Sequence, residues 1–112
     1  MNYNKSINLL KNLPKKLNNF YIKNLKYVIK INNKSKNKNI YDPVTNLDRS
    51  FEKYIRHIIV KEFPEDAILG EEFLEKYSDN DYKWYVDPID GTRAFMVGAP
   101  TWSNLIGLTY RN

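Results

Sequence analysis

Apolar positions at helical spacing run through the first third of the chain. Between residues 5 and 31 they recur at about every third or fourth position. Pro14 falls within this pattern, and proline lacks the N–H that a helix interior needs. The pattern therefore predicts a short first helix and a second one over residues 17–31. Residues 32–41 (NNKSKNKNIY) are polar and low in complexity, which predicts a solvated, mobile loop.

The most regular helical pattern lies between residues 46 and 63. Six apolar side chains fall on one stripe with a period of about 3.6 residues: Leu47, Phe51, Tyr54, Ile55, Ile58 and Ile59. Thr45 is a good N-cap and Pro64 ends the pattern. Asp48 directly follows the first residue of the stripe, so its carboxylate is expected to lean off the apolar face.

Three shorter apolar runs in the C-terminal half predict strands, over residues 67–69, 84–86 and 103–110. Residues 71–77 predict a short helix, and residues 92–97 predict a helical turn. A chain of 112 residues allows one domain at most, and a three-stranded sheet against three helices could form it.

Charge is divided unevenly along the chain. Residues 1–41 hold ten Lys and no acidic residue, whereas residues 42–112 hold eight Lys and Arg and 13 Asp and Glu. A basic arm can bind nucleic acid by releasing counterions. Its lysines are scattered, however, and Asn, Lys, Ile and Tyr, all encodable by A/T-rich codons, make up 49 of the 112 residues. We therefore do not expect nucleic acid as the partner, and anion binding stays open as an alternative.

Other compositional features exclude several classes of protein. Cysteine is absent, which excludes disulfides, thiolate metal sites and a cysteine nucleophile. No apolar run approaches the roughly 18 residues of a membrane span, and the N-terminus lacks the apolar core of a signal peptide. We expect a cytoplasmic protein with no membrane partner.

The segment VDPIDGT, residues 86–92, carries the strongest chemical signal. It places two carboxylates, Asp87 and Asp90, three residues apart and directly after an apolar strand. The proline between them restricts the backbone and Gly91 permits a sharp turn. Both carboxylates and the carbonyl of Ile89 can then point at one place. Oxygen donors of this kind suit Mg²⁺. The simpler alternative is that the segment is a β-turn whose carboxylates are solvated.

Two further acidic groups lie at the ends of predicted elements. Glu71 follows the strand at 67–69, and Asp48 lies at the start of the helix at 46–63. Each has a simpler explanation, since Glu71 suits a charged loop and Asp48 complements the helix dipole. Free amides at Gly91 and Thr92 can bind an anion where the next helical turn begins. A hard metal beside a phosphate site is typical of phosphate chemistry.

These segments together resemble the inositol monophosphatase family of Mg²⁺-dependent phosphatases. DPVTNLD at 42–48 matches the family's V-T-x-x-D segment, LGEE at 69–72 matches G-E-E, and WYVDPIDGT at 84–92 matches W-x-x-D-P-[IL]-D-G-T. The order and the intervals also fit over residues 40–110. Within the family, the tract at 92–102 is most similar to bacterial histidinol-phosphatase-like members.

The resemblance implies a layered α/β (α+β) architecture, the sugar-phosphatase fold, with helices packed on a mainly antiparallel sheet. Relatives are longer, and this sequence lacks their W-D-x-x-A-G segment, whose Asp completes the second metal site. The expectation is a single partial domain, the N-terminal half of that fold. Residues 1–39 would be a basic helical region with a polar loop, and residues 40–112 the metal- and phosphate-binding half. Turnover by this chain alone is then expected to be low or nil.

The resemblance also implies metal ligands and a reaction. Glu71, Asp87 and the carbonyl of Ile89 would hold a first Mg²⁺. Asp87 and Asp90 would hold a second one. The reaction would be hydrolysis of a small phosphate monoester by metal-activated water, with histidinol phosphate as the first candidate substrate and inositol monophosphate as the next.

The same resemblance assigns the catalytic and phosphate-binding groups. Thr92, assisted by Asp48, would orient and deprotonate the attacking water, so these two residues and Glu71 form the catalytic set. The amides of Gly91 and Thr92 would bind the phosphate. Partners would be the phosphorylated metabolite and either a second copy or a separately encoded C-terminal half. A non-catalytic half that docks to a partner chain is the remaining alternative.

Overall fold

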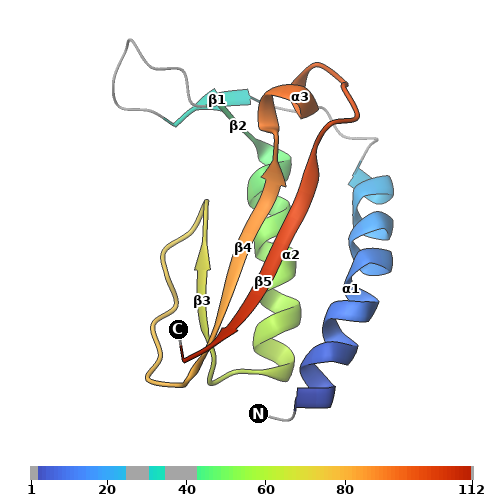
Figure 1. Cartoon of the computed structure of the whole chain (residues 1–112). Coiled ribbons are helices and arrows are strands. Elements are labelled where there is room, and N and C mark those ends of the chain that lie inside the picture. The colour runs from blue at the N-terminus through green and yellow to red at the C-terminus, as the bar shows by residue number, and fades with distance from the viewer. Residues whose placement is uncertain (1–2, 25–30, 35–42, 112) are drawn as a thin grey trace.

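A computed structural model describes residues 3–24, 31–34 and 43–111. In chain order the elements are α1 (Tyr3–Asn24), β1 (Ile31–Asn33), β2 (Pro43–Thr45), α2 (Asn46–Glu62), β3 (Ala67–Gly70), β4 (Tyr82–Asp90), α3 (Thr92–Met96) and β5 (Ser103–Tyr110). The sheet β3-β4-β5 forms one layer, and α2 and α1 cover one of its faces (Figure 1). No described element covers the other face. The predicted layered α/β class is confirmed.

The sheet is mixed rather than mainly antiparallel. β3 pairs with β4 in parallel, β4 pairs with β5 in antiparallel fashion, and β1 and β2 form a separate antiparallel pair. β3 and β4 can run parallel because the segment at 71–81 brings the chain back to the end of the sheet where β3 starts. A connection between parallel strands requires such a return.

The helix α1 is continuous, so the predicted break at Pro14 is wrong. Leu9, Leu13 and Leu17 lie on one face of α1 and are buried in the core. Their burial outweighs the hydrogen bond lost at proline, whose cost in a helix interior is about 3 kcal/mol. The second predicted helix is also wrong in its extent, because α1 ends at Asn24 and residue 31 belongs to β1. Residues 25–30 lie outside the described ranges.

Replacing Pro14 with alanine should stabilise the protein by about 1–2 kcal/mol, since it restores an N–H donor for the carbonyl four residues earlier. Pro14 is exposed, so the change costs little packing. Chemical denaturation measures the gain, and Lys15→Ala on the exposed side of α1 is the control. A stability equal to or below that of the wild type would show that α1 accommodates proline without cost.

The helix α2 confirms the regular apolar stripe. It begins after Thr45, whose side chain caps it in a reciprocal capping box with Asp48. It ends at Glu62, one residue before the predicted end. The stripe is buried against the sheet, and four members are 0–2% exposed: Leu47, Phe51, Ile55 and Ile59.

The strand predictions hold, with corrections in the connections. β3 and β5 occupy the predicted runs, β4 is longer than predicted, and the helical turn after Gly91 is α3. The predicted helix at 71–77 is wrong, because Lys76 instead forms a bridge with Ile68 in β3. The predicted loop at 32–41 is wrong where β1 pairs with β2, and its residues 35–41 lie outside the described ranges.

Candidate active site

Asp48 connects the start of α2 to the start of α3. One carboxylate oxygen, Oδ1, accepts hydrogen bonds from the Thr45 amide at 2.8 Å and the Thr45 hydroxyl at 2.5 Å. The other, Oδ2, accepts from the Thr92 hydroxyl at 3.0 Å. The side chain was expected off the apolar stripe, but it is buried and only 2% exposed. The capping box therefore fixes an acceptor that points at Thr92.

Thr92 lies where β4 turns into α3. Its hydroxyl oxygen is 3.0 Å from Asp48 Oδ2 and 3.1 Å from the carbonyl oxygen of Ile89. A hydroxyl has one proton, so it donates to one of these acceptors at a time and keeps its lone pairs for another donor. Thr92 can thus accept a hydrogen bond from water while it donates its own hydroxyl proton to a hydrogen bond with Asp48.

The turn between β4 and α3 requires glycine. Gly91 has φ of 88° in the left-handed region and occupies the N-cap of α3. A Cβ at this position would lie 2.8 Å from the carbonyl oxygen of Thr101. The pairing of β4 with β5 is irregular between Asp87 and Asp90, which ends the regular ladder just before the turn.

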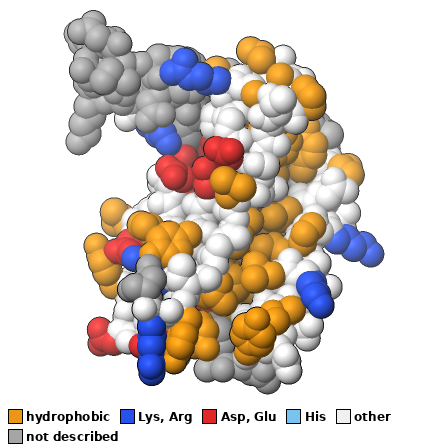
Figure 2. Space-filling model, viewed as in Figure 1, with side chains coloured by type: hydrophobic (Ala, Val, Ile, Leu, Met, Phe, Trp, Pro, Cys, Tyr) orange, Lys and Arg blue, Asp and Glu red, His pale blue; other side chains and the backbone are white. Residues whose placement is uncertain are grey.

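A cleft of about 310 Å³ lies beside this turn. Glu71, Asp87, Ile89 and Thr92 line it together with Gly91 and two basic residues, Lys34 and Arg93. Figure 2 shows acidic side chains gathered on this face of the molecule, next to the apolar surface of the sheet. The cleft thus joins the ends of β3 and β4 to the start of α3.

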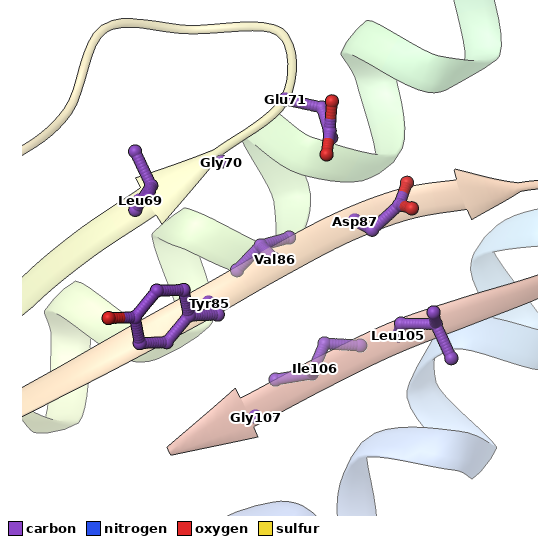
Figure 3. Close-up of a pocket in the computed structure, with 9 residues that line it drawn as sticks. All are labelled: Leu69, Gly70, Glu71, Tyr85, Val86, Asp87, Leu105, Ile106 and Gly107. Atoms are coloured by element: carbon purple, nitrogen blue, oxygen red, sulfur yellow. The ribbon is translucent and has the colours of Figure 1, made fainter. Parts of the chain in front are cut away.

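Glu71 and Asp87 point toward one another across the ends of β3 and β4 (Figure 3). They also border a second hollow of about 450 Å³, which runs along the uncovered face of the sheet. Leu69, Tyr85 and Leu105 line that hollow. The two carboxylates therefore stand at the border between a polar cleft and an apolar surface.

The cleft concentrates negative charge. Burial raises the pKa of Asp87, and the neighbouring carboxylates of Glu71, Asp90 and Asp48 raise it further, while Lys34 lowers it. Burial likewise raises the pKa of Glu72, with Lys34 offsetting part of the effect through an ion pair at 3.3 Å. A cation that binds here would relieve this repulsion.

The donors around the cleft fit Mg²⁺ by their chemistry. Glu71, Asp87 and the carbonyl of Ile89 offer oxygen only, the ligand type that Mg²⁺ prefers. Asp90, the remaining predicted ligand, is exposed and does not line the cleft. In the described part of the chain, no three His, Cys, Asp or Glu side chains are gathered closely enough to enclose a metal ion. The ligand set therefore stays a prediction.

Sequence reasoning missed Glu52, the side chain that organises the segment carrying Glu71. Glu52 is 0% exposed on α2, and its carboxylate accepts the amides of Glu71, Glu72 and Phe73. The position of Glu52 in the sequence could have indicated that it is buried and hydrogen-bonded. Glu52 lies one helical turn after Asp48, at the border of the apolar stripe, where an acidic side chain needs buried partners.

Comparison with known proteins identifies the same family over nearly the whole chain. The profile of the inositol monophosphatase family matches residues 6–112. A histidinol-phosphatase from Chlorobaculum parvum is 48% identical over 66 residues, which are 59% of this chain and 26% of that protein. Within residues 3–24, 31–34 and 43–111, no helix has both the length and the apolar character of a membrane span.

Solved structures share the fold. A staphylococcal IMPase-I complexed with products has a TM-score of 0.82 at 20% identity, over 99% of this chain and 41% of that one. An IMPase/NADP phosphatase complexed with Mg²⁺ and phosphate has a TM-score of 0.79 at 22% identity, over 96% of this chain and 40% of that one. The chain thus spans about two fifths of the length of these structures and about a quarter of the curated relative's length.

Proposed function

Because the chain belongs to the inositol monophosphatase family, we propose that its cleft serves Mg²⁺-dependent hydrolysis of a small phosphate monoester. The observation that carries this proposal is the arrangement around Thr92. Its hydroxyl is hydrogen-bonded to buried Asp48 and lies in the same cleft as Glu71 and Asp87. A site with a polarised hydroxyl beside facing carboxylates has the groups that water activation next to a metal requires.

Glu71, Asp87 and the carbonyl of Ile89 are the proposed ligands of one Mg²⁺. Asp87 and Asp90 are the proposed contribution to a second ion. When bound, Mg²⁺ supplies activation of water and neutralisation of phosphate charge. The raised pKa of Asp87 supports this assignment, because repulsion among the carboxylates is what a divalent cation would offset.

Thr92 and Asp48 are proposed to handle the proton of the attacking water. Thr92 Oγ1 accepts a hydrogen bond from water while its own proton is directed to Asp48 Oδ2. Asp48 keeps its orientation through the two bonds to Thr45. Gly91 and Thr92 line the cleft, and their amides are proposed to bind the phosphate oxygens.

Histidinol phosphate is the proposed substrate, with inositol monophosphate as the next candidate. The 48% identical relative named histidinol-phosphatase supports the first. The second rests on the names of the family and of its solved structures. A cytoplasmic location, a homodimer and a separately encoded second half remain predictions.

The proposal is tested by phosphate release from the two substrates, with Mg²⁺ and with EDTA. Two preparations are compared: the 112-residue chain, and the same chain joined to the part of the C. parvum enzyme beyond its matched region. We expect Mg²⁺-dependent release from histidinol phosphate by the joined protein and little by the chain alone. Metal-independent release, or none from either substrate, would contradict the proposal.

Thr92→Val should lower kcat of the joined protein by about 100-fold or more, since it removes the group that orients water. Thr92→Ser keeps a hydroxyl within reach of Asp48 and should retain most of the activity. Steady-state kinetics of both variants measures the difference. Equal losses in the two variants would show that the hydroxyl itself is not required.

A second candidate function is favoured by the uncovered face of the sheet. Leu105 on β5 is 50% exposed and Leu69 on β3 is 38% exposed; both line the hollow on this face, and β3 and β5 are the two edge strands of the sheet. Exposed edges with apolar side chains favour association, which supports the alternative of a non-catalytic half that docks to a partner chain. A monodisperse monomer in sedimentation velocity, with cooperative unfolding, would count against it.

A further inference from the structure

Glu52 is a buried carboxylate whose hydrogen-bond partners all help to hold one short segment. Oε1 accepts the amides of Glu71 at 2.7 Å and Glu72 at 2.9 Å. Oε2 accepts the amide of Phe73 and the Arg56 side chain, each at 3.0 Å. Arg56 also donates to the Phe73 carbonyl at 3.2 Å. The segment at 71–73 is thereby tied to α2 through its backbone.

The close approach of β3 to Glu52 shows how specific this arrangement is. A Cβ on Gly70 would lie 2.4–2.5 Å from the carboxylate atoms of Glu52, so a side chain there would displace the carboxylate from its present position. A buried carboxylate is unfavourable unless its oxygens are matched by donors. Here three amides and one guanidinium supply the match. The predicted helix at 71–77 does not form because Lys76 pairs with Ile68 of β3 through its amide and its carbonyl.

Glu52 affects the cleft because it holds the backbone of Glu71. Its amide is bonded to Glu52, and its side chain points from there toward Asp87 (Figure 3). Asp48, one turn earlier on α2, accepts a hydrogen bond from the side-chain hydroxyl of Thr92. One face of α2 therefore positions groups from two segments that are far apart in the sequence.

We propose that Glu52 is a positioning residue that sets the carboxylate of Glu71 for the divalent cation. This inference rests on the proposed function, because it assumes that Glu71 is a ligand. Glu52 does not line the cleft and acts only through the backbone of 71–73. Partners that orient metal ligands typically change metal affinity by about 10–100-fold when they are removed.

The test uses Glu52→Gln in the whole 112-residue chain. Glutamine has one acceptor oxygen in place of two and places an NH₂ group against amide donors. We expect Mn²⁺ affinity, measured by EPR titration, to fall about tenfold or more. In ¹⁵N NMR spectra, the amide signals of residues 71–73 should move while those of the core strands stay in place. Glu65→Gln, at an exposed acid after α2, is the matched control and should leave both readouts unchanged.

The outcomes separate this inference from the proposed function. Wild-type affinity in Glu52→Gln, with displaced signals at 71–73, would overturn the positioning role alone. No Mn²⁺ binding by the wild-type chain would overturn both. If Glu52→Gln does not fold, Arg56→Lys decides, because it keeps the charge but loses the two-sided contact with Glu52 and Phe73. A weaker affinity in Arg56→Lys supports the positioning role, and an unchanged one overturns it.

Discussion

Asp87→Asn should weaken divalent-cation binding by about 100-fold or more, because it removes the charge of a proposed ligand to both ions. The same change should stabilise the metal-free chain at neutral pH. Burial and the carboxylates of Glu71, Asp90 and Asp48 raise the pKa of Asp87. A carboxyl group whose pKa is raised by folding favours the folded state while it is protonated, below about pH 4. This stabilisation is lost as the pH rises through the pKa of the folded state.

Calorimetric titration with Mn²⁺ measures the first effect, and thermal unfolding in EDTA measures the second. The gain in Tm of Asp87→Asn over the wild type should be largest at pH 7 and should shrink toward pH 4. Asp79→Asn, at an exposed acid that does not line the cleft, is the control. Unchanged affinity in Asp87→Asn would remove Asp87 from the ligand set.

Phe51→Ala should cost about 3–5 kcal/mol of stability, which is a large part of the 5–15 kcal/mol typical of a domain. Phe51 is 0% exposed and joins three parts of the fold. Its ring centroid lies 5.0 Å from that of Phe20 in α1 and 6.4 Å from that of Trp102, just before β5. Truncation therefore opens a cavity where both helices meet the sheet.

Urea unfolding followed by circular dichroism measures this loss. Val60→Ala, on the same helix at a side chain that is 37% exposed, is the control and should change stability by about 1 kcal/mol or less. A similarly small effect in Phe51→Ala would mean that the contact between α1 and α2 does not hold the fold together.

The parts of the fold that were predictable from the sequence are those set by local patterns. The stripe of α2 and the Thr45 cap depend on spacing and on one side chain, and both were predicted. The course of α1 through Pro14 was not predictable from local preference, because burial of leucines against distant residues decides it. The predicted helix at 71–77 failed for a similar reason, since Lys76 pairs with Ile68 of β3, a contact that local preference does not show.

The candidate site was also predictable from the sequence only in part. The facing carboxylates and Thr92 were visible as motifs, because they lie at the ends of strands and at a glycine turn. The structure adds that Asp48 is buried and bonded to Thr92 across 44 residues of sequence. Asp90, which the resemblance implies as a ligand of a second ion, does not line the cleft, but its charge acts on Asp87, and its role stays a prediction.

Whether the cleft beside Thr92 binds a divalent cation is decided by a ¹⁵N NMR titration of the chain with MgCl₂. We expect saturable shifts of the amide signals at residues 71–72, 87 and 89–92, reversed by EDTA. Shifts spread over exposed acids elsewhere, such as Glu65 and Asp79, or no saturable shift at all, would contradict binding in the cleft.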